Sequence, residues 1–156
     1  MELDEALKII EKHKNSVPVE TIPLARDLGL KVYYSDWPDN ISGCLKRDEK
    51  SKSGYSIFVN TNHHPNRRRF TIAHEIAHFV LHRDLIGDGI TDDKLYRSGM
   101  TNKVEAQANS FAADILMPRP QLRKDLEDPD ASMEGLARKY GVSKAAMSIR
   151  LGVPYD

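Results

Sequence analysis

The stretch Arg69–His82 has the sequence RFTIAHEIAHFVLH and contains the most informative pattern of the chain. Its apolar residues recur at helical spacing and form one stripe: Phe70, Ala73, Ala77, Val80 and Leu81. This period predicts an amphipathic helix that runs to about Arg83. His74 and His78 are four positions apart, so their rings share one helix face, about 6 Å apart along the axis.

Two imidazoles at this spacing can converge on one ion at about 2.1 Å. Glu75 projects from an adjacent part of the same face, where it can reach a metal-bound water without being a ligand. The pattern His-Glu-x-x-His therefore predicts a metal site with His74 and His78 as ligands and Glu75 as general base. The alternative is an amphipathic helix whose two histidines face solvent.

A catalytic zinc usually takes three protein ligands and keeps one position for water. His82 is a poor third ligand, because about 12 Å of helix axis separates it from His74. We interpret it as a polar helix end. Glu105 begins a second predicted helix, Val104–Met117, and shares a face with Asn109. The alanines of that helix would let it pack closely on the first: Ala106, Ala108, Ala112 and Ala113. Glu105 could then reach the metal while Asn109 steadies a ligand. A helix-start glutamate favoured by the dipole explains Glu105 equally well.

The rest of the chain indicates a mixed α+β fold. Three apolar, β-branched or aromatic stretches predict strands: Leu30–Tyr34, Ile41–Leu45 and Tyr55–Val59. The polar stretch Lys46–Gly54 suits a long hairpin loop, so we expect a small, mostly antiparallel, three-stranded sheet. Two short helices precede it, the second over Ile22–Leu28 with Thr21 as cap and Gly29 beyond its end. We expect a loop over Asp84–Asn102 and a polar linker over Gln121–Ala131.

The C-terminal residues 136–150 resemble a helix-turn-helix pair. Gly141 suits the turn, and Ser143 can cap the second helix. Four basic residues and one acidic residue lie between Met133 and Gly152, as in a DNA-binding module. A helical subdomain packed beside the active site would look the same. The alanines of the second helix disfavour base reading.

Composition sets the broad class of the protein. The 156 residues contain 23 Lys and Arg and 23 Asp and Glu, so the formal net charge is zero and no global attraction to nucleic acid or membrane follows. The single Cys44 cannot form an internal disulfide and is interpreted as a core residue. The start of the chain shows no secretory pattern. We expect a cytoplasmic protein.

Two motifs together resemble the ImmA/IrrE family of zinc metallopeptidases. They are RFTIAHEIAHFVLH over 69–82 and EAQANSFAADILMP over 105–118. The resemblance implies a zincin-like fold with an active-site helix, and Glu105 as third ligand of one catalytic zinc. It also implies a metallopeptidase domain over 1–120, with the linker and helical pair of 121–156 packed on the same domain.

Relatives in that family act on helix-turn-helix repressors. The resemblance therefore implies an endopeptidase that hydrolyses such a repressor or an antitoxin, with Glu75 assisting the attack of zinc-bound water. An oxyanion donor is also needed, and four residues could supply it: Tyr55, His63, Tyr96 and Arg97. His63 and His64 themselves are expected to be exposed. Two alternatives stay open. One is a non-proteolytic toxin or regulator that binds a repressor or antitoxin, and the other is a DNA-binding regulator with a structural metal.

Overall fold

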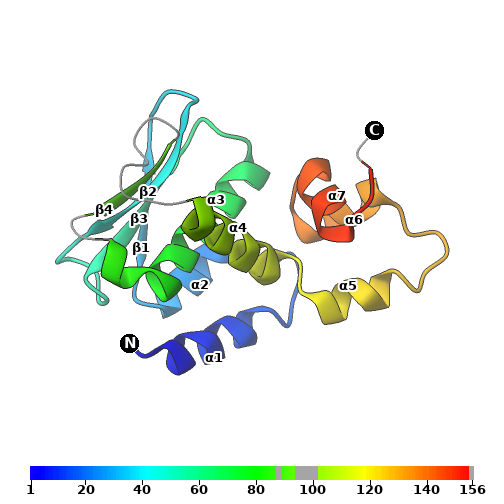
Figure 1. Cartoon of the computed structure of the whole chain (residues 1–156), viewed down its shortest axis with the longest axis horizontal. Coiled ribbons are helices and arrows are strands. Elements are labelled where there is room, and N and C mark those ends of the chain that lie inside the picture. The colour runs from blue at the N-terminus through cyan, green and yellow to red at the C-terminus, as the bar shows by residue number, and fades with distance from the viewer. Residues whose placement is uncertain (87–88, 94–101, 155–156) are drawn as a thin grey trace.

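The fold is described by a computed structural model covering residues 1–86, 89–93 and 102–154. The β-sheet forms one end of the molecule, and the last two helices form the other (Figure 1). Helices α3 and α4 lie between these two ends, and α1 and α2 lie beside them. The fold is mixed α+β, as predicted.

Four strands form one sheet in the order β1-β3-β2-β4. Their bounds are β1 Lys31–Ser35, β2 Ile41–Arg47, β3 Tyr55–Asn60 and β4 Gly89–Asp93. The three predicted strands are present, and β2 pairs with β3 as the predicted antiparallel hairpin. β1 runs parallel to β3, whereas β4 is antiparallel to β2. The sheet is therefore mostly antiparallel.

The fourth strand corrects the prediction of a loop over Asp84–Asn102. This segment forms the 3-10 turn η1 (Arg83–Leu85) and then β4. The sequence GITDD of β4 has little β-propensity of its own. The segment becomes a strand because it pairs with β2. The periodicity of the segment's own sequence cannot reveal a partner that is distant in the chain.

The described residues also form seven α-helices. They are α1 Leu3–His13, α2 Thr21–Asp27, α3 Pro65–Leu81, α4 Asn102–Leu116, α5 Arg119–Asp125, α6 Met133–Tyr140 and α7 Lys144–Leu151. Thr21 is the first residue of α2 and not its cap, which is Glu20, while Gly29 adopts φ 83° just beyond the helix as predicted. The predicted linker Gln121–Ala131 is wrong in its first part, because α5 covers it. None of the helices described is both long and apolar enough to cross a membrane.

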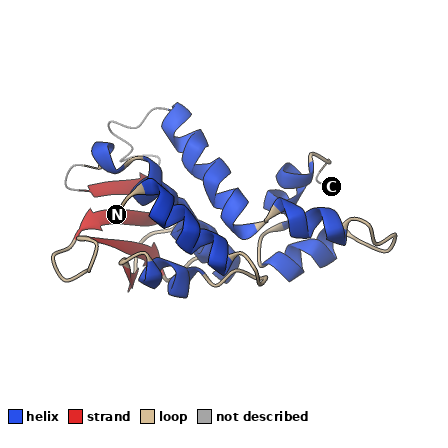
Figure 2. Ribbon diagram, turned by 90° about the horizontal axis from the view of Figure 1, so that it is seen from below, coloured by secondary structure: helices blue, strands red, loops and turns tan. Residues whose placement is uncertain are grey.

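Helix α3 packs against the sheet and carries much of the core (Figure 2). Ile72, Ile76 and Phe79 of α3 are buried with Leu45 of β2 and Ile57 of β3. Cys44 is buried in β2, as predicted. A continuous apolar contact between one helix and two central strands gives α3 a fixed position over the sheet.

At Gly43 the backbone of β2 approaches α3 so closely that a side chain would not fit. A Cβ atom there would overlap the Thr71 methyl group and lie 3.4 Å from a Glu75 carboxylate oxygen. Glycine is therefore required by packing at this position. The sheet thus comes within contact distance of the predicted general base.

The C-terminal helices are held against α3 and α4 by two arginines. Arg69 of α3 donates to the carbonyl of Gly141 at 3.1 Å and to that of Tyr140 at 3.3 Å, at the end of α6. Arg150 of α7 donates to the Met117 carbonyl at 2.9 Å and pairs with Asp114 at 2.7 Å. We call these contacts the junction.

The turn between α6 and α7 has the predicted chemistry. Gly141 adopts φ 67°, and the Ser143 side chain accepts a hydrogen bond from the Ala146 amide at 3.0 Å. A left-handed glycine ends α6 and a serine cap starts α7. The two helices therefore form a compact pair.

Candidate metal centre

The start of α3 follows from its sequence. Pro65 occupies the first turn, where its missing N–H costs nothing, and the His64 ring accepts a hydrogen bond from the Asn66 amide at 3.0 Å. From Thr71 to Phe79 every residue of the helix is buried. His74, Glu75 and His78 therefore face protein and not solvent, which excludes the alternative of two solvent-facing histidines.

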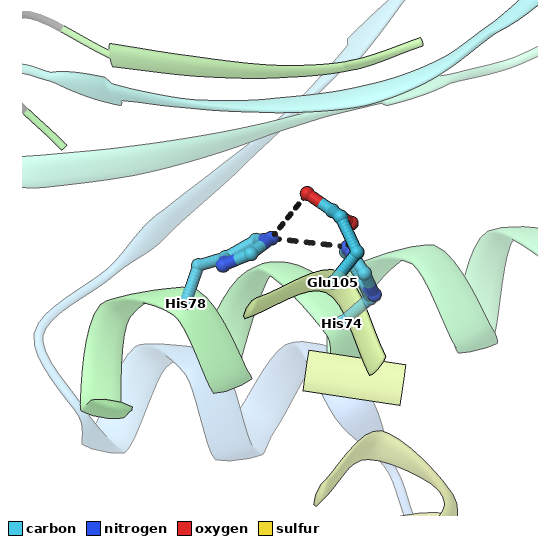
Figure 3. A group of neighbouring side chains, drawn as sticks. All are labelled: His74, His78 and Glu105. Atoms are coloured by element: carbon cyan, nitrogen blue, oxygen red, sulfur yellow. Dashed lines mark hydrogen bonds and ion pairs between the residues drawn. The ribbon is translucent and has the colours of Figure 1, made fainter. Parts of the chain in front are cut away.

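Helix α4 brings the third predicted ligand to this face. Ala108 and Ala112 are fully buried, and α4 packs along α3, while Ala106 is exposed. Two of the four alanines thus provide the predicted close packing. Glu105, 5% exposed, lies one turn before Ala108 on the same face and reaches the histidines. Candidate ligand atoms of His74, His78 and Glu105 all lie within 4.8 Å of one another (Figure 3).

The distances inside this cluster suit a tetrahedral ion. Metal–ligand bonds of about 2.1 Å at tetrahedral angles place neighbouring ligand atoms about 3.4 Å apart. The Nε2 atoms of His74 and His78 are 3.1 Å apart. Glu105 places one oxygen 3.1 Å from His74 Nε2 and the other 3.4 Å from His78 Nε2. The three residues therefore fit one small divalent ion.

The electrostatics of the cluster favour a cation over protons. Burial lowers the pKa of His78, which keeps its ring neutral and able to ligate at pH 7. Burial alone would raise the pKa of Glu105, but the adjacent rings of His74 and His78 hold it well below its ordinary value. Two neutral nitrogens and one carboxylate form a donor set with net charge −1, which suits zinc among other ions.

Glu75 is the most unusual group near the cluster. Its side chain is fully buried, and neither carboxylate oxygen has a hydrogen-bond partner among the described residues. Buried polar groups in proteins are nearly always paired, so an unpaired carboxylate has a specific reason. A general base that must accept a proton from a reacting water needs a free oxygen of this kind.

A cavity of about 630 Å³ opens beside the cluster. It is lined by side chains from β2, α3, α4 and α7 and from the turns before α3 and α7. They are Ser42, His64, Asn66, Arg67, Phe70, Thr71, His74, Asn109, Val142, Ser143, Ala146 and Ile149. We call this cavity the groove. Because His74 belongs both to the groove and to the candidate ligands, a molecule in the groove would lie next to the candidate metal centre.

Of the other predicted site residues, His63 is misjudged as exposed. The residue is 5% exposed, and Nε2 lies 2.9 Å from the Asp39 carbonyl oxygen, so the ring anchors a loop. His64 is exposed, as predicted. Tyr55 packs edge-on against Phe79 in the core. Asn109 lies at the wall of the groove, and its role stays a prediction.

Tyr96 and Arg97 lie outside the described residues. The role of oxyanion donor that the sequence suggests for them therefore stays a prediction.

Two residues near the ligands have contacts that the sequence interpretation missed. His82 is 7% exposed, and its Nδ1 lies 3.0 Å from Nδ1 of His78. Its other ring nitrogen lies 2.9 Å from the side-chain carbonyl oxygen of Gln107. The interpretation of His82 as a polar helix end missed this burial, although its spacing of four from His78 already placed both rings on one face.

Two curated relatives share sequence with this chain. It is 30% identical over 111 residues to "uncharacterized immunity region protein 2" of Bacillus phage phi105, a match covering 71% of this chain and 65% of that protein. It is 38% identical over 73 residues to the radiation response metalloprotease IrrE of Deinococcus radiodurans, covering 46% of this chain and 22% of that one. The matches thus span less than two thirds of either relative.

A solved structure shares the fold. A Mycobacterium tuberculosis transcriptional regulator superposes with a TM-score of 0.59 at 19% identity, covering 98% of this chain and 52% of that one. At this identity the likeness concerns the fold alone.

The fold and the buried His, His, Glu cluster define a protein built like a metallopeptidase. The model of the peptidase M78 family, described as the IrrE N-terminal-like domain, matches residues 25–152. The chain belongs to this metallopeptidase family, which confirms the resemblance seen in its two motifs.

Proposed function

We propose that this protein is a zinc endopeptidase in which His74, His78 and Glu105 hold one catalytic ion and Glu75 is the general base. The observation that carries the proposal is the fully buried, unpaired carboxylate of Glu75, the residue after His74, together with three ligand atoms at tetrahedral spacing. We assign a zincin-like fold on the same basis, since an active-site helix packs against a small sheet. Asn109 is assigned a supporting role at the wall of the groove.

A bound zinc would supply Lewis-acid activation of a water molecule and of the scissile carbonyl. The protein's own contribution is the handling of the proton. Glu75 accepts it as the water attacks and delivers it to the leaving amine. Its burial keeps competing water away.

We assign the groove to the substrate. Its walls combine apolar side chains of α3 and α7, such as Phe70 and Ile149, with the cationic Arg67. Ile149 is 83% exposed, so its side chain is available to a molecule in the groove. An extended segment with a large apolar side chain and an adjacent acidic residue would match this lining.

On this assignment the helix-turn-helix-like pair serves substrate binding and not DNA binding. Arg150 has a side chain only 6% exposed, engaged with Met117 and Asp114, and Lys144 pairs with Glu134. These basic groups therefore contact protein. We accordingly treat residues 121–156 as a wall of the metallopeptidase domain formed by 1–120.

The proposed substrate is a helix-turn-helix repressor or an antitoxin. One relative is a phage protein named for an immunity region, and another is named as a radiation response metalloprotease. Both names suit a peptidase that acts on a regulator. The groove combines apolar surface with polar side chains and the cationic Arg67, and this mixture suits a protein segment better than a small polar molecule.

The test compares zinc-loaded wild type with Glu75→Gln against the helix-turn-helix protein encoded nearest to its gene. Gln keeps the shape of Glu75 but cannot accept the proton. We expect equal zinc content and cleavage at least about 1,000-fold slower, within the range that general bases contribute. Normal cleavage by a zinc-loaded Glu75→Gln protein would overturn the mechanism. A stable complex without cleavage, unaffected by chelator, would favour the non-proteolytic alternative.

A further inference from the structure

Behind the candidate ligands, the described structure contains a chain of hydrogen bonds that the proposed mechanism does not use. It starts at the Gln107 side chain on α4, passes through the His82 ring at the end of α3, and reaches the Nδ1 atom of His78. The two contacts measure 2.9 and 3.0 Å. His78 is fully buried and His82 is 7% exposed, so water does not replace these contacts.

The direction of the protons in this chain follows from Gln107. Its Oε1 atom can only accept, so Nε2 of His82 must carry a hydrogen. In a neutral imidazole the other nitrogen is then an acceptor, and Nδ1 of His82 receives the hydrogen of His78 Nδ1. His78 therefore has a bare Nε2. That atom faces Nε2 of His74 and the Glu105 carboxylate, so the hydrogen donated to this carboxylate comes from the His74 ring.

The opposite arrangement would block the site. If an amide N–H faced His82, both rings would adopt the other tautomer, and Nε2 of His78 would carry a hydrogen toward the ligand cluster. A protonated nitrogen cannot bind a metal ion. The carbonyl oxygen of Gln107 thus determines the tautomer of His78, which lies two hydrogen bonds away.

We infer that Gln107 and His82 are positioning residues that fix His78 in its metal-binding tautomer and orientation. Neither touches the ion or the substrate. The inference rests on the proposed metal centre, but it concerns a property of the protein that exists before any ion binds. Metal-ligating histidines generally need such a partner for the second ring nitrogen, and its loss typically costs about 10- to 100-fold in affinity.

Gln107 is suited to a test because the residue is exposed, although its side-chain oxygen contacts His82. Substitution should therefore not disturb the core. Gln107→Met keeps the length and removes the acceptor. Gln107→Glu keeps an acceptor and has no donor, so it serves as the rescue variant. Zinc affinity of each protein is measured by competition with a chromophoric chelator at pH 8.5.

We expect Gln107→Met to bind zinc about 10- to 100-fold more weakly and Gln107→Glu to stay within a few-fold of wild type. His82→Phe should lose a similar amount, and adding Gln107→Met to it should cost nothing further, because the chain is already broken. Wild-type affinity in Gln107→Met, or an additive loss in the double variant, would overturn the inference.

The tautomers of the two rings give a second measurement, because a variant that only weakens packing would leave them unchanged. Nitrogen-15 NMR of the metal-free wild type should show His78 protonated at Nδ1 and His82 at Nε2. In Gln107→Met the His82 signals should shift toward a mixture. A wild-type His78 protonated at Nε2 would contradict the inference even if zinc binds normally. Failure of the wild type to bind zinc would instead refute the metal centre, leaving the NMR result to decide the tautomers.

Discussion

Two regions of this molecule bury polar groups, and they treat them in opposite ways. At the junction, Arg69 and Arg150 reach backbone carbonyls at 2.9 to 3.3 Å, and Arg150 also pairs with Asp114. At the metal centre, the Glu75 carboxylate is buried without a hydrogen-bond partner among the described residues, and Glu105 faces two histidine rings. The arginines of the junction have hydrogen-bond partners, whereas the Glu75 carboxylate has none among the described residues.

The difference separates structural from functional burial. Leaving a buried polar group unpaired costs about 1–3 kcal/mol, and more for a charge. A fold keeps such groups where a ligand, an ion or a reaction supplies the missing partner. We therefore expect substitutions at the junction to lower stability and spare metal binding, and substitutions at the centre to weaken metal binding.

The largest effect is expected for Glu105→Gln. Zinc affinity should fall on the order of 1,000-fold, because one of three ligands loses its charge. The free energy of unfolding in chelator should also fall, because the lowered pKa of Glu105 means that the folded state favours its charged form. Chelator competition and urea unfolding measure the two quantities. Glu134→Gln, at a side chain 64% exposed, is the control and should change neither. A Glu105→Gln protein with wild-type zinc affinity would refute the assignment of this ligand.

Arg150→Ala tests the other half of the comparison. It removes the contacts to the Met117 carbonyl and Asp114 and should lower the free energy of unfolding by about 2–3 kcal/mol. Zinc affinity should stay within about two-fold. The matched variant is Arg138→Ala on α6, whose side chain is exposed. Equal stability of the two variants would show that the junction contributes nothing.

Gly43→Ala should affect both properties at an intermediate level. The new methyl group would overlap the Thr71 methyl and press toward Glu75, costing about 1–3 kcal/mol of stability and slowing peptide cleavage. Thr71→Ser removes the opposing methyl, so the double variant Gly43→Ala, Thr71→Ser should recover most of both losses. A double variant no better than Gly43→Ala would place the cause elsewhere.

The smallest effect concerns pH in the metal-free protein. Burial lowers the pKa of His78 below its unfolded value of about 6.5, so below that pH the unfolded chain binds more protons than the folded one. Stability should therefore decline as the pH falls from about 6.5, by at most about 1.4 kcal/mol per pH unit from this group. Urea unfolding with chelator at pH 7.5, 6.5 and 5.5 measures the slope. His78→Gln should flatten it, whereas His13→Gln, at a histidine paired with Asp27 near the surface, should not.

The sequence predicted those parts of the centre that lie on one helix. His74, Glu75 and His78 follow from a spacing that the helix itself imposes. Glu105 is different, because its approach depends on how α4 packs on α3, and spacing within α4 left two interpretations open. The His82–Gln107 contact joins the same two helices and has no pattern in either one alone.

The fold shows the same division between local and tertiary causes. The glycine turn at Gly141 and the cap at Ser143 were predicted because a local backbone requirement selects those residues. Strand β4 was missed because its partner β2 is more than forty residues away in sequence. Helix α5 was missed because its residues, RPQLRKD, are mostly polar and bury only Leu122.

The position of Glu105 on a different helix from the histidines has one further consequence. An ion at this centre would join two points of the chain separated by 26 intervening residues, and that interval contains β4, so the metal would act as a reversible cross-link. For a ligand that binds only the folded form, each tenfold rise in free concentration above the dissociation constant adds about 1.4 kcal/mol of stability. Zinc supply would thus set how long the protein survives as well as how fast it works.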